Sequence, residues 1–206
     1  AGTLQIDDTG VVDVDGDYLQ AEAGVLQIEL AGESLGQFGR IDVLGAVDLE
    51  GTLEVSLDGL FQVDAGDQFQ LISGASLTGT FDTTSLPAIA AELVWDLNYT
   101  GTAVSLDVLY AADFNGDGTV NDVDLAQWQA SYGSTSAEHS DGDANGDGQV
   151  NGLDFLVWQQ QNGLVAALTG IAQVPEPNSL LLALSALAVG TSRRSKREVP
   201  MVRKAR

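Results

Sequence analysis

The chain has 206 residues, 44% of them hydrophobic, and a formal net charge of -22 from 30 acidic and 8 basic residues. Seven of the eight bases lie beyond residue 192, so the preceding part carries one base, Arg40, against 29 acids. Such a surface excludes nucleic acid and anionic lipid as partners and suits a calcium-containing exterior. The hydrophobic content excludes a wholly disordered chain, and the absence of cysteine excludes a disulfide framework.

Residues 1–110 contain short apolar runs with strict alternation, separated by glycine-containing turns. Alternation predicts half-buried strands, because successive side chains of a strand point to opposite faces. The clearest runs are Leu26, Ile28, Leu30; Leu53, Val55, Leu57; Leu93, Trp95, Leu97; and Val104, Leu106, Val108. We therefore predict a mainly β region over 1–110, either the end of a parallel β-helix or a β-sandwich-like cap.

Within this region, residues 60–110 carry a Gly-Asp-x-Phe strand at 66–69 and a Trp-Asp-x-x-Tyr-Thr strand at 95–100. These patterns are similar to the end regions of secreted, autotransporter-like β-helical passenger proteins. The resemblance implies an architectural role, in which the segment covers the open end of a solenoid whose unpaired strand edge would otherwise promote aggregation.

Two twelve-residue stretches, DFNGDGTVNDVD from Asp113 and DANGDGQVNGLD from Asp143, have the spacing of calcium-binding loops. A calcium ion takes six to eight oxygen ligands, and position 6 needs glycine for a sharp turn, here Gly118 and Gly148. The repetition predicts two calcium ions. The expected ligands are Asp113, Asn115, Asp117, the carbonyl of Thr119, Asn121 and Asp124 in the first loop, and Asp143, Asn145, Asp147, the carbonyl of Gln149, Asn151 and Asp154 in the second.

Each loop is followed by apolar residues at helical spacing, and no helix is recognisable before either loop. Leu125, Trp128 and Tyr132 are spaced i, i+3, i+7 in the first unit, and Phe155 and Trp158 are their counterparts in the second. Gly133 and Gly163 then occupy the position that ends a helix. Without a cation the loop carboxylates repel one another, and so small a unit buries little apolar surface, so calcium is expected to be required for folding.

This duplicated loop and helix, with aspartate at position 12, resembles the type I dockerin family over residues 111–165. The resemblance implies a calcium-folded module that binds a cohesin-like protein and usually places a polysaccharide-degrading enzyme on a scaffold. The serine/threonine pair typical of loop positions 10 and 11 is absent, which leaves open a role as a stabilising calcium unit. By the resemblance, the partner-binding residues are Asp122, Val123, Gln127, Gly152, Leu153 and Gln159.

The C-terminal part divides into a linker over 166–178 and an apolar run with a basic tail over 179–206. It resembles the PEP-CTERM sorting tail, which implies cleavage by an exosortase-type protease and delivery to the bacterial cell surface or matrix. A helix over 179–190 is about 18 Å long against a hydrocarbon core of about 30 Å. The segment 179–192 is therefore expected to contact the membrane transiently, with a tail anchor or a buried amphipathic helix as alternatives. The sorting residues are Pro175, Glu176, Pro177, Arg193 and Arg194.

No catalytic constellation is recognisable. His139, the only histidine, lies between the loops and is interpreted as a solvated linker residue. Because the chain begins at Ala1 without methionine, we expect it to be the C-terminal piece of a longer exported protein. We predict a surface-sorted structural or adhesive interaction protein. The alternative is the C-terminal part of an extracellular O-glycosyl hydrolase, with catalysis upstream and a polysaccharide as substrate.

Overall fold

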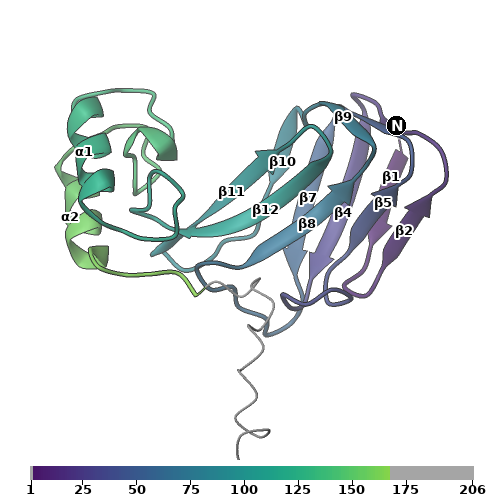
Figure 1. Ribbon diagram of the computed structural model, residues 1–206, viewed down its shortest axis with the longest axis horizontal. Helices are drawn as coiled ribbons and strands as arrows, with labels where there is room; N and C mark the ends of the chain where they lie inside the picture. Colours follow the sequence, from purple (N-terminus) through teal and green to yellow (C-terminus); the bar gives the residue numbers. More distant parts are fainter. Residues whose placement is uncertain (1, 168–206) are drawn as a thin grey trace, which may run out of the picture. The chain divides into compact units, whose positions relative to one another are not determined.

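The computed structural model describes residues 2–167; the predicted sorting motif and apolar tail lie outside them. Within the described range the chain forms three sheets followed by a small helical part (Figure 1). The strands are β1 (Gly2–Ile6), β2 (Val11–Val14), β3 (Tyr18–Gln20), β4 (Gly24–Leu30), β5 (Arg40–Val43), β6 (Ala46–Leu49), β7 (Thr52–Leu57), β8 (Gln68–Ser73), β9 (Ser76–Gly79), β10 (Thr83–Ser85), β11 (Leu93–Tyr99) and β12 (Ala103–Tyr110).

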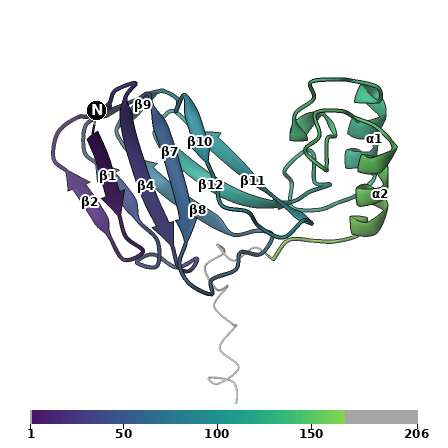
Figure 2. The ribbon, with the colours of Figure 1, turned by 180° about the vertical axis from the view of Figure 1, so that it is seen from behind.

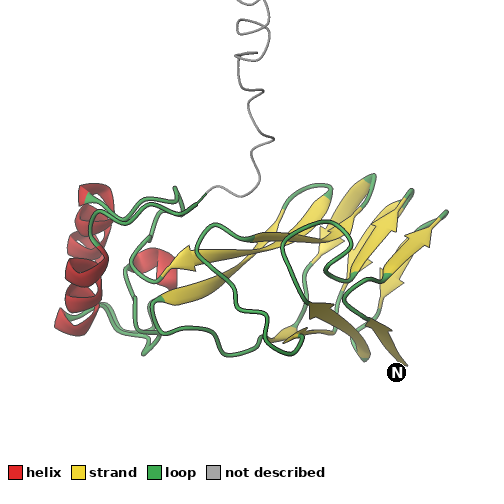
Figure 3. Cartoon of the chain, turned by 90° about the horizontal axis from the view of Figure 1, so that it is seen from below, coloured by secondary structure: helices red, strands yellow, loops and turns green. Residues whose placement is uncertain are grey.

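The chain winds through the three sheets in turn, so that each winding adds one strand to each sheet. The strand orders are β1-β4-β7-β10, β11-β12-β8-β5-β2 and β3-β6-β9. Pairing is parallel throughout, except that β12 runs antiparallel to both β8 and β11. Figures 2 and 3 show the successive windings as adjacent strands. The prediction of a mainly β region is confirmed, and the four alternating runs form β4, β7, β11 and β12.

The core is a set of aliphatic stacks that run across the windings. Leu26 of β4 is in register with Leu4 of β1 and with Leu53 of β7, and Ile28 is likewise in register with Ile6 and Val55. Leu26 and Leu53 are fully buried. Because parallel pairing places equivalent residues directly beside one another, each winding repeats the apolar pattern of the previous one and extends the same core.

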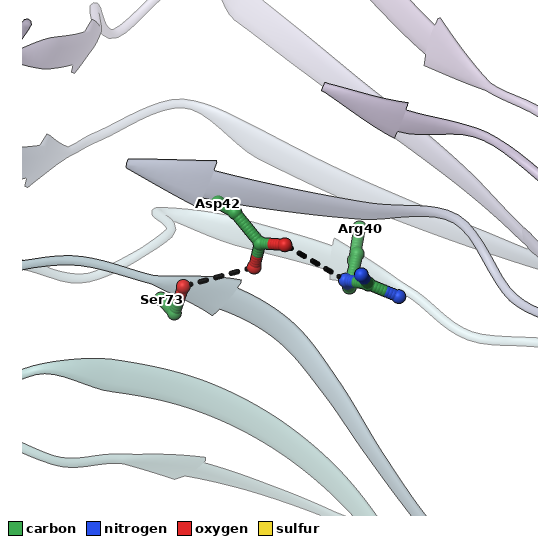
Figure 4. Close-up of polar contacts among 3 residues, drawn as sticks. All are labelled: Arg40, Asp42 and Ser73. Carbon is green, nitrogen blue, oxygen red and sulfur yellow. Dashed lines mark hydrogen bonds and ion pairs between the residues drawn. The ribbon is translucent and has the colours of Figure 1, made fainter. Parts of the chain in front are cut away.

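Polar side chains on the outer faces also connect neighbouring strands. The Asp42 carboxylate accepts hydrogen bonds of 2.9 Å from Arg40 Nε and from Ser73 Oγ of β8 (Figure 4). Arg40 is the only lysine or arginine in the described residues 2–167. Its positive charge is therefore already engaged with Asp42 on the β region.

The hairpin of β11 and β12 lies against the last full winding and extends the sheet that contains β8. Phe69 of β8 is fully buried beneath it, with ring centroids 5.5 Å from Phe38, 6.3 Å from Phe61 and 6.3 Å from Trp95. The Trp95 indole donates a 2.8 Å hydrogen bond to the carbonyl of Pro87. This aromatic cluster joins the β11–β12 hairpin to the parallel windings.

Replacing Phe69 with alanine should lower the free energy of unfolding of the β region by about 3–5 kcal/mol, because the substitution leaves a cavity among three aromatic rings. Leu60→Ala is the control, since Leu60 is 98% exposed, and it should change stability by less than about 0.5 kcal/mol. Denaturant unfolding followed by circular dichroism at strand wavelengths measures both. Equal effects of the two substitutions would contradict the assignment of Phe69 to the core.

Candidate metal centre

The first loop follows directly after β12, which ends at Tyr110. Each loop leads into a ten-residue helix, α1 (Asp122–Ser131) or α2 (Gly152–Gln161), and a short 3-10 helix, η1 (His139–Asp141), precedes the second loop. Gly118 and Gly148 have φ of 81° and 77°, as predicted for position 6. Gly133 and Gly163, with φ of 92° and 91°, follow the helix caps as predicted. Helix α1 ends at Ser131, so Tyr132 lies just beyond the helix in which the apolar spacing places it.

The aspartate at position 12 closes each loop and caps the helix that follows. Asp124 accepts hydrogen bonds from the backbone N–H groups of Phe114 at 2.9 Å, Asn115 at 3.3 Å and Asn121 at 2.8 Å. Asp154 accepts the equivalent bonds from Ala144, Asn145 and Asn151 at 3.0, 3.3 and 2.8 Å. The carboxylate therefore completes a capping box at N3 while it holds the start of the loop.

The aspartate at position 1 binds the backbone in the middle of its own loop. Asp113 accepts from the N–H groups of Gly118 at 2.8 Å and Asp117 at 3.2 Å. Asp143 accepts from Gly148 at 2.7 Å, with further bonds from Gly146 and Asp147. Asp113, Asp124 and Asp154 are fully buried and Asp143 is 5% exposed. Each loop thus holds two buried carboxylates at its two ends.

Within residues 2–167 these buried carboxylates form no ion pair with a lysine or arginine. Arg40 is the only lysine or arginine among residues 2–167, and it is bound to Asp42. Burial raises the pKa of Asp113, the N–H of Gly118 lowers it, and the negative charge of Asp124 raises it again. A bound cation at each loop would compensate this charge, because an ionised carboxylate is costly to bury without a partner.

The oxygens at positions 3 and 5 are more exposed and bind within the loop. Asn115 Nδ2 donates to Asp117 at 2.9 Å, and Asp117 in turn accepts from the N–H of Thr119 at 2.9 Å. Among residues 2–167 no group of three or more His, Cys, Asp or Glu side chains is arranged to hold a metal ion. The negative charges of Asp117 and Asp124 both act on the Asp113 carboxylate, so the acids at positions 1, 5 and 12 of the first loop lie near one another.

The asparagine at position 9 completes a set of candidate metal ligands that are all oxygen atoms. Asn121 and Asn151 accept from the N–H groups of Val123 and Leu153 at 2.7 and 2.8 Å, so they act as helix N-caps. Asn121 Nδ2 also donates to the carbonyl of Thr119 at 3.0 Å. Carboxylate, amide and carbonyl oxygens are the ligands that calcium prefers. The donor chemistry and the uncompensated buried charge both fit a calcium ion.

The two loop-helix units bind one another reciprocally. The indole N–H of Trp128 in α1 donates to the carbonyl of Asn151 in the second loop, and that of Trp158 in α2 donates to Asn121 in the first, both at 2.9 Å. The buried valine at position 8 of each loop donates its backbone N–H to the segment that follows the other unit's helix. The N–H of Val120 donates to the carbonyl of Leu164 at 3.0 Å, and that of Val150 donates to the carbonyl of Ser134 at 3.1 Å. Neither loop is therefore structurally independent of the other.

Two polar side chains join the loops and helices to the β-hairpin. The interpretation of His139 as a solvated residue is wrong: its Nε2 lies 3.1 Å from the carbonyl of Ala111 and its ring packs 5.6 Å from that of Phe114. Gln161, only 4% exposed, accepts from the N–H of Ala112 and donates to the carbonyl of Glu92, both at 2.8 Å. Neither role can be predicted from the local sequence, because both depend on contacts between residues far apart in the chain.

The residues predicted to bind a partner lie at the helix starts and on α2. Val123 and Leu153 are 56% and 55% exposed, and Asp122, Gly152 and Gln159 are exposed as well. Gln127 differs, because its amide donates to the carbonyls of Ser140 and of Phe114, the latter at 3.3 Å. Gln127 therefore contributes to the internal structure of the first unit.

Residues 111–161, about a quarter of the chain, match the family model of the dockerin type I domain. The prediction of a dockerin module is thereby confirmed; type I dockerin domains bind calcium and interact with cohesins, and dockerin proteins are typically extracellular or at the cell surface. A search of curated proteins finds no match to the chain. No helix within residues 2–167 has the length and apolar character needed to cross a membrane. The PEP-CTERM and passenger resemblances stay predictions.

Burial lowers the pKa of His139, although the carbonyl of Ala111 and the charges of Asp96 and Asp113 act in the opposite direction. The pKa of His139 in the folded protein thus lies below its unfolded value of about 6.5. The contribution of the neutral ring to stability is therefore complete above about pH 6.5 and is lost progressively as the pH falls toward the folded pKa. We expect the difference in unfolding free energy between the wild type and His139→Gln, with calcium saturating, to shrink from about pH 7 to about pH 5. A difference independent of pH would contradict a partly buried, neutral ring.

The reciprocal indole bonds predict that Trp158→Phe destabilises the calcium-loaded protein by about 1 kcal/mol, because the carbonyl of Asn121 loses its donor while most ring packing is kept. Trp128→Phe should have an effect of similar size through Asn151. Thermal unfolding in excess calcium, followed by circular dichroism at helix wavelengths, measures both. Unchanged unfolding of both variants would show that the two units do not depend on these bonds.

Proposed function

We propose that the dockerin module binds two calcium ions, one in each loop, and that the ions complete its fold. The supporting observation is the pair of buried aspartates in each loop, which have no basic partner within residues 2–167. Binding would draw the exposed oxygens at positions 3 and 5 toward the buried ones and offset their mutual repulsion. The residues proposed to hold the ions are Asp113, Asn115, Asp117, Thr119, Asn121 and Asp124, and Asp143, Asn145, Asp147, Gln149, Asn151 and Asp154.

We further propose that the chain is an exported interaction protein whose module binds a cohesin-type partner through the exposed start of α1 or of α2. The family match supports the partner class, and the exposure of Val123 and Leu153 supports the location. The β region has an architectural role in this proposal: it is the end of a parallel β-helical solenoid, which the antiparallel hairpin of β11 and β12 covers. Its parallel, in-register windings support this assignment over a sandwich-like cap.

Delivery to the cell surface through Pro175-Glu176-Pro177 and an exosortase-type protease remains part of the proposal, together with transient membrane contact by residues 179–192. Both segments lie outside the described residues. The alternative role, tethering of an extracellular polysaccharide-degrading enzyme, is favoured by the dockerin match and would place catalysis upstream of these residues. A hydrolase domain encoded upstream would support the alternative, and further β-helical repeats would support the surface protein.

Calorimetric titration of calcium into the chelated full chain tests the proposed metal sites. We expect two ions for the wild type and one ion for Asp124→Asn and for Asp154→Asn, because each substitution removes the charge of one buried ligand while it keeps the side-chain shape. The remaining ion should bind more weakly than in the wild type, since the two loops hold each other through the indoles of Trp128 and Trp158. Asp122→Asn is the matched control, since Asp122 is an exposed loop acid outside the ligand set, and it should still bind two.

Binding of no calcium by the wild type, or stoichiometry that the Asp124 and Asp154 variants leave unchanged, would overturn the proposed metal sites. A single ion in the wild type would restrict the proposal to one loop, and the two variants would then identify which loop holds it.

A further inference from the structure

The outward faces of α1 and α2 differ, although residues thirty positions apart are structurally equivalent throughout the module. On α1 the exposed row begins with Asp122 and Val123 and continues with Ala126. On α2 the equivalent row is Gly152, Leu153 and Leu156. Residues at i and i+3 of a helix lie on one face, so each row forms a continuous strip of surface.

The strip on α2 is apolar and uncharged, whereas the strip on α1 is small and begins with a carboxylate. Leu153 and Leu156 are 55% and 50% exposed. Their α1 equivalents are a valine, 56% exposed, and an alanine. Large leucines half-exposed next to each other on one helix are unfavourable in water and are typical of a surface that becomes covered by a partner.

We propose that a cohesin-type partner docks on α2 in one orientation, with Leu153 and Leu156 against an apolar patch of the partner. The inference rests on the proposed cohesin-binding function and adds to it the helix, the orientation and Leu156 as a specificity residue. The internal near-symmetry of the module offers a second orientation with α1 in the same place. The difference between the two strips selects the first.

The orientation with α2 against the partner is favoured because the second orientation costs binding free energy. It would place the Asp122 carboxylate where the first orientation has only Gly152, so the same apolar patch would have to desolvate a charge. Residues 2–167 offer that carboxylate no basic neighbour, because Arg40 binds Asp42. The second orientation would also replace Leu156 with Ala126 and leave the apolar patch of the partner partly unfilled.

One exposed aromatic side chain of the module lies apart from the strip. Tyr132 is 62% exposed, but it follows the end of α1 and its ring packs at 5.0 Å against Trp128, which faces the second loop. Gln127, the residue after Ala126, binds inside the first unit. Neither side chain therefore adds apolar surface to the α1 strip.

The test measures calorimetric binding of the calcium-loaded full chain to a panel of type I cohesin domains. The double substitution Leu153→Ser with Leu156→Gln should weaken binding at least about tenfold, because the two leucines that the partner would cover become polar. The equivalent α1 substitutions, Val123→Ser with Ala126→Gln, distinguish the two helices and should change binding less than about twofold if α2 alone is covered. Leu60→Ser, at a 98% exposed leucine of the β region, is the control outside the module. Circular dichroism confirms that both double variants keep the helix content of the wild type.

A strip transplant provides the second arm. In the Leu153→Ser, Leu156→Gln background, the substitutions Asp122→Gly, Val123→Leu and Ala126→Leu give α1 the apolar strip of α2. Binding should return to within about threefold of the wild type, because the module can then turn around and present α1. Conversely, Gly152→Asp alone should weaken binding; a Cβ at Gly152 meets no atom within 4 Å, so the change acts through charge rather than through a clash inside the chain.

Equal losses from the α1 and α2 double variants, or failure of the transplant to restore binding, would overturn the single-orientation inference and leave the cohesin function standing. If the calcium-loaded wild type binds no cohesin of the panel, the cohesin function fails and the inference fails with it. Sedimentation of the wild type alone completes the test. Self-association that Leu153→Ser with Leu156→Gln abolishes would identify a second copy of this chain as the occupant and would also overturn the inference.

Discussion

The negative charge of four buried aspartates is the constraint on which the helical part of the chain depends. Asp113 and Asp124 lie at the two ends of the first loop, and Asp143 and Asp154 at the two ends of the second. Their partners within the described residues 2–167 are backbone N–H groups. Hydrogen bonds from N–H groups reduce the cost of burying a carboxylate but leave its net charge in place. On this account a cation in each loop supplies the positive charge that balances these carboxylates.

The reciprocal contacts extend this dependence from one loop to the other. Trp158 of α2 holds the carbonyl of Asn121, and Trp128 of α1 holds that of Asn151, so distortion of either loop is transmitted to the opposite helix. The strands have a different source of stability, because their core consists of aliphatic and aromatic side chains that pack against one another. The strands and the module belong to the same compact unit, and Gln161 and His139 connect them through backbone carbonyls and an N–H group.

Local patterns in the sequence predicted the parts of the structure that depend on local geometry. Alternation located β4, β7, β11 and β12, and the glycines at loop position 6 and after each helix were identified because a positive φ is required there. The short strands β3, β9 and β10 have three or four residues, too few for a periodic signal. Their positions follow from parallel pairing with strands about thirty residues away, which no local window contains.

The same distinction applies to the candidate site. The ligand positions follow from spacing within twelve residues, but the indole bonds, the anchoring role of Gln161 and the contact of His139 with Ala111 connect residues 23 to 69 positions apart. A polar residue in a short loop reads as solvated when only its neighbours are considered, and His139 is such a case. The different strips of α1 and α2 are visible in the sequence only after the structure shows which residues face outward.

Amide hydrogen exchange of the full chain, with calcium and after chelation, tests most directly whether the module depends on a cation while the strands do not. The account predicts that chelation removes protection from the amides of Val120 and Val150 and from both indole N–H groups, whereas amides of Leu26 and Leu53 keep theirs. Protection of Val120 and Val150 that persists without calcium would contradict the account, because the buried aspartates would then be stable with backbone N–H groups alone.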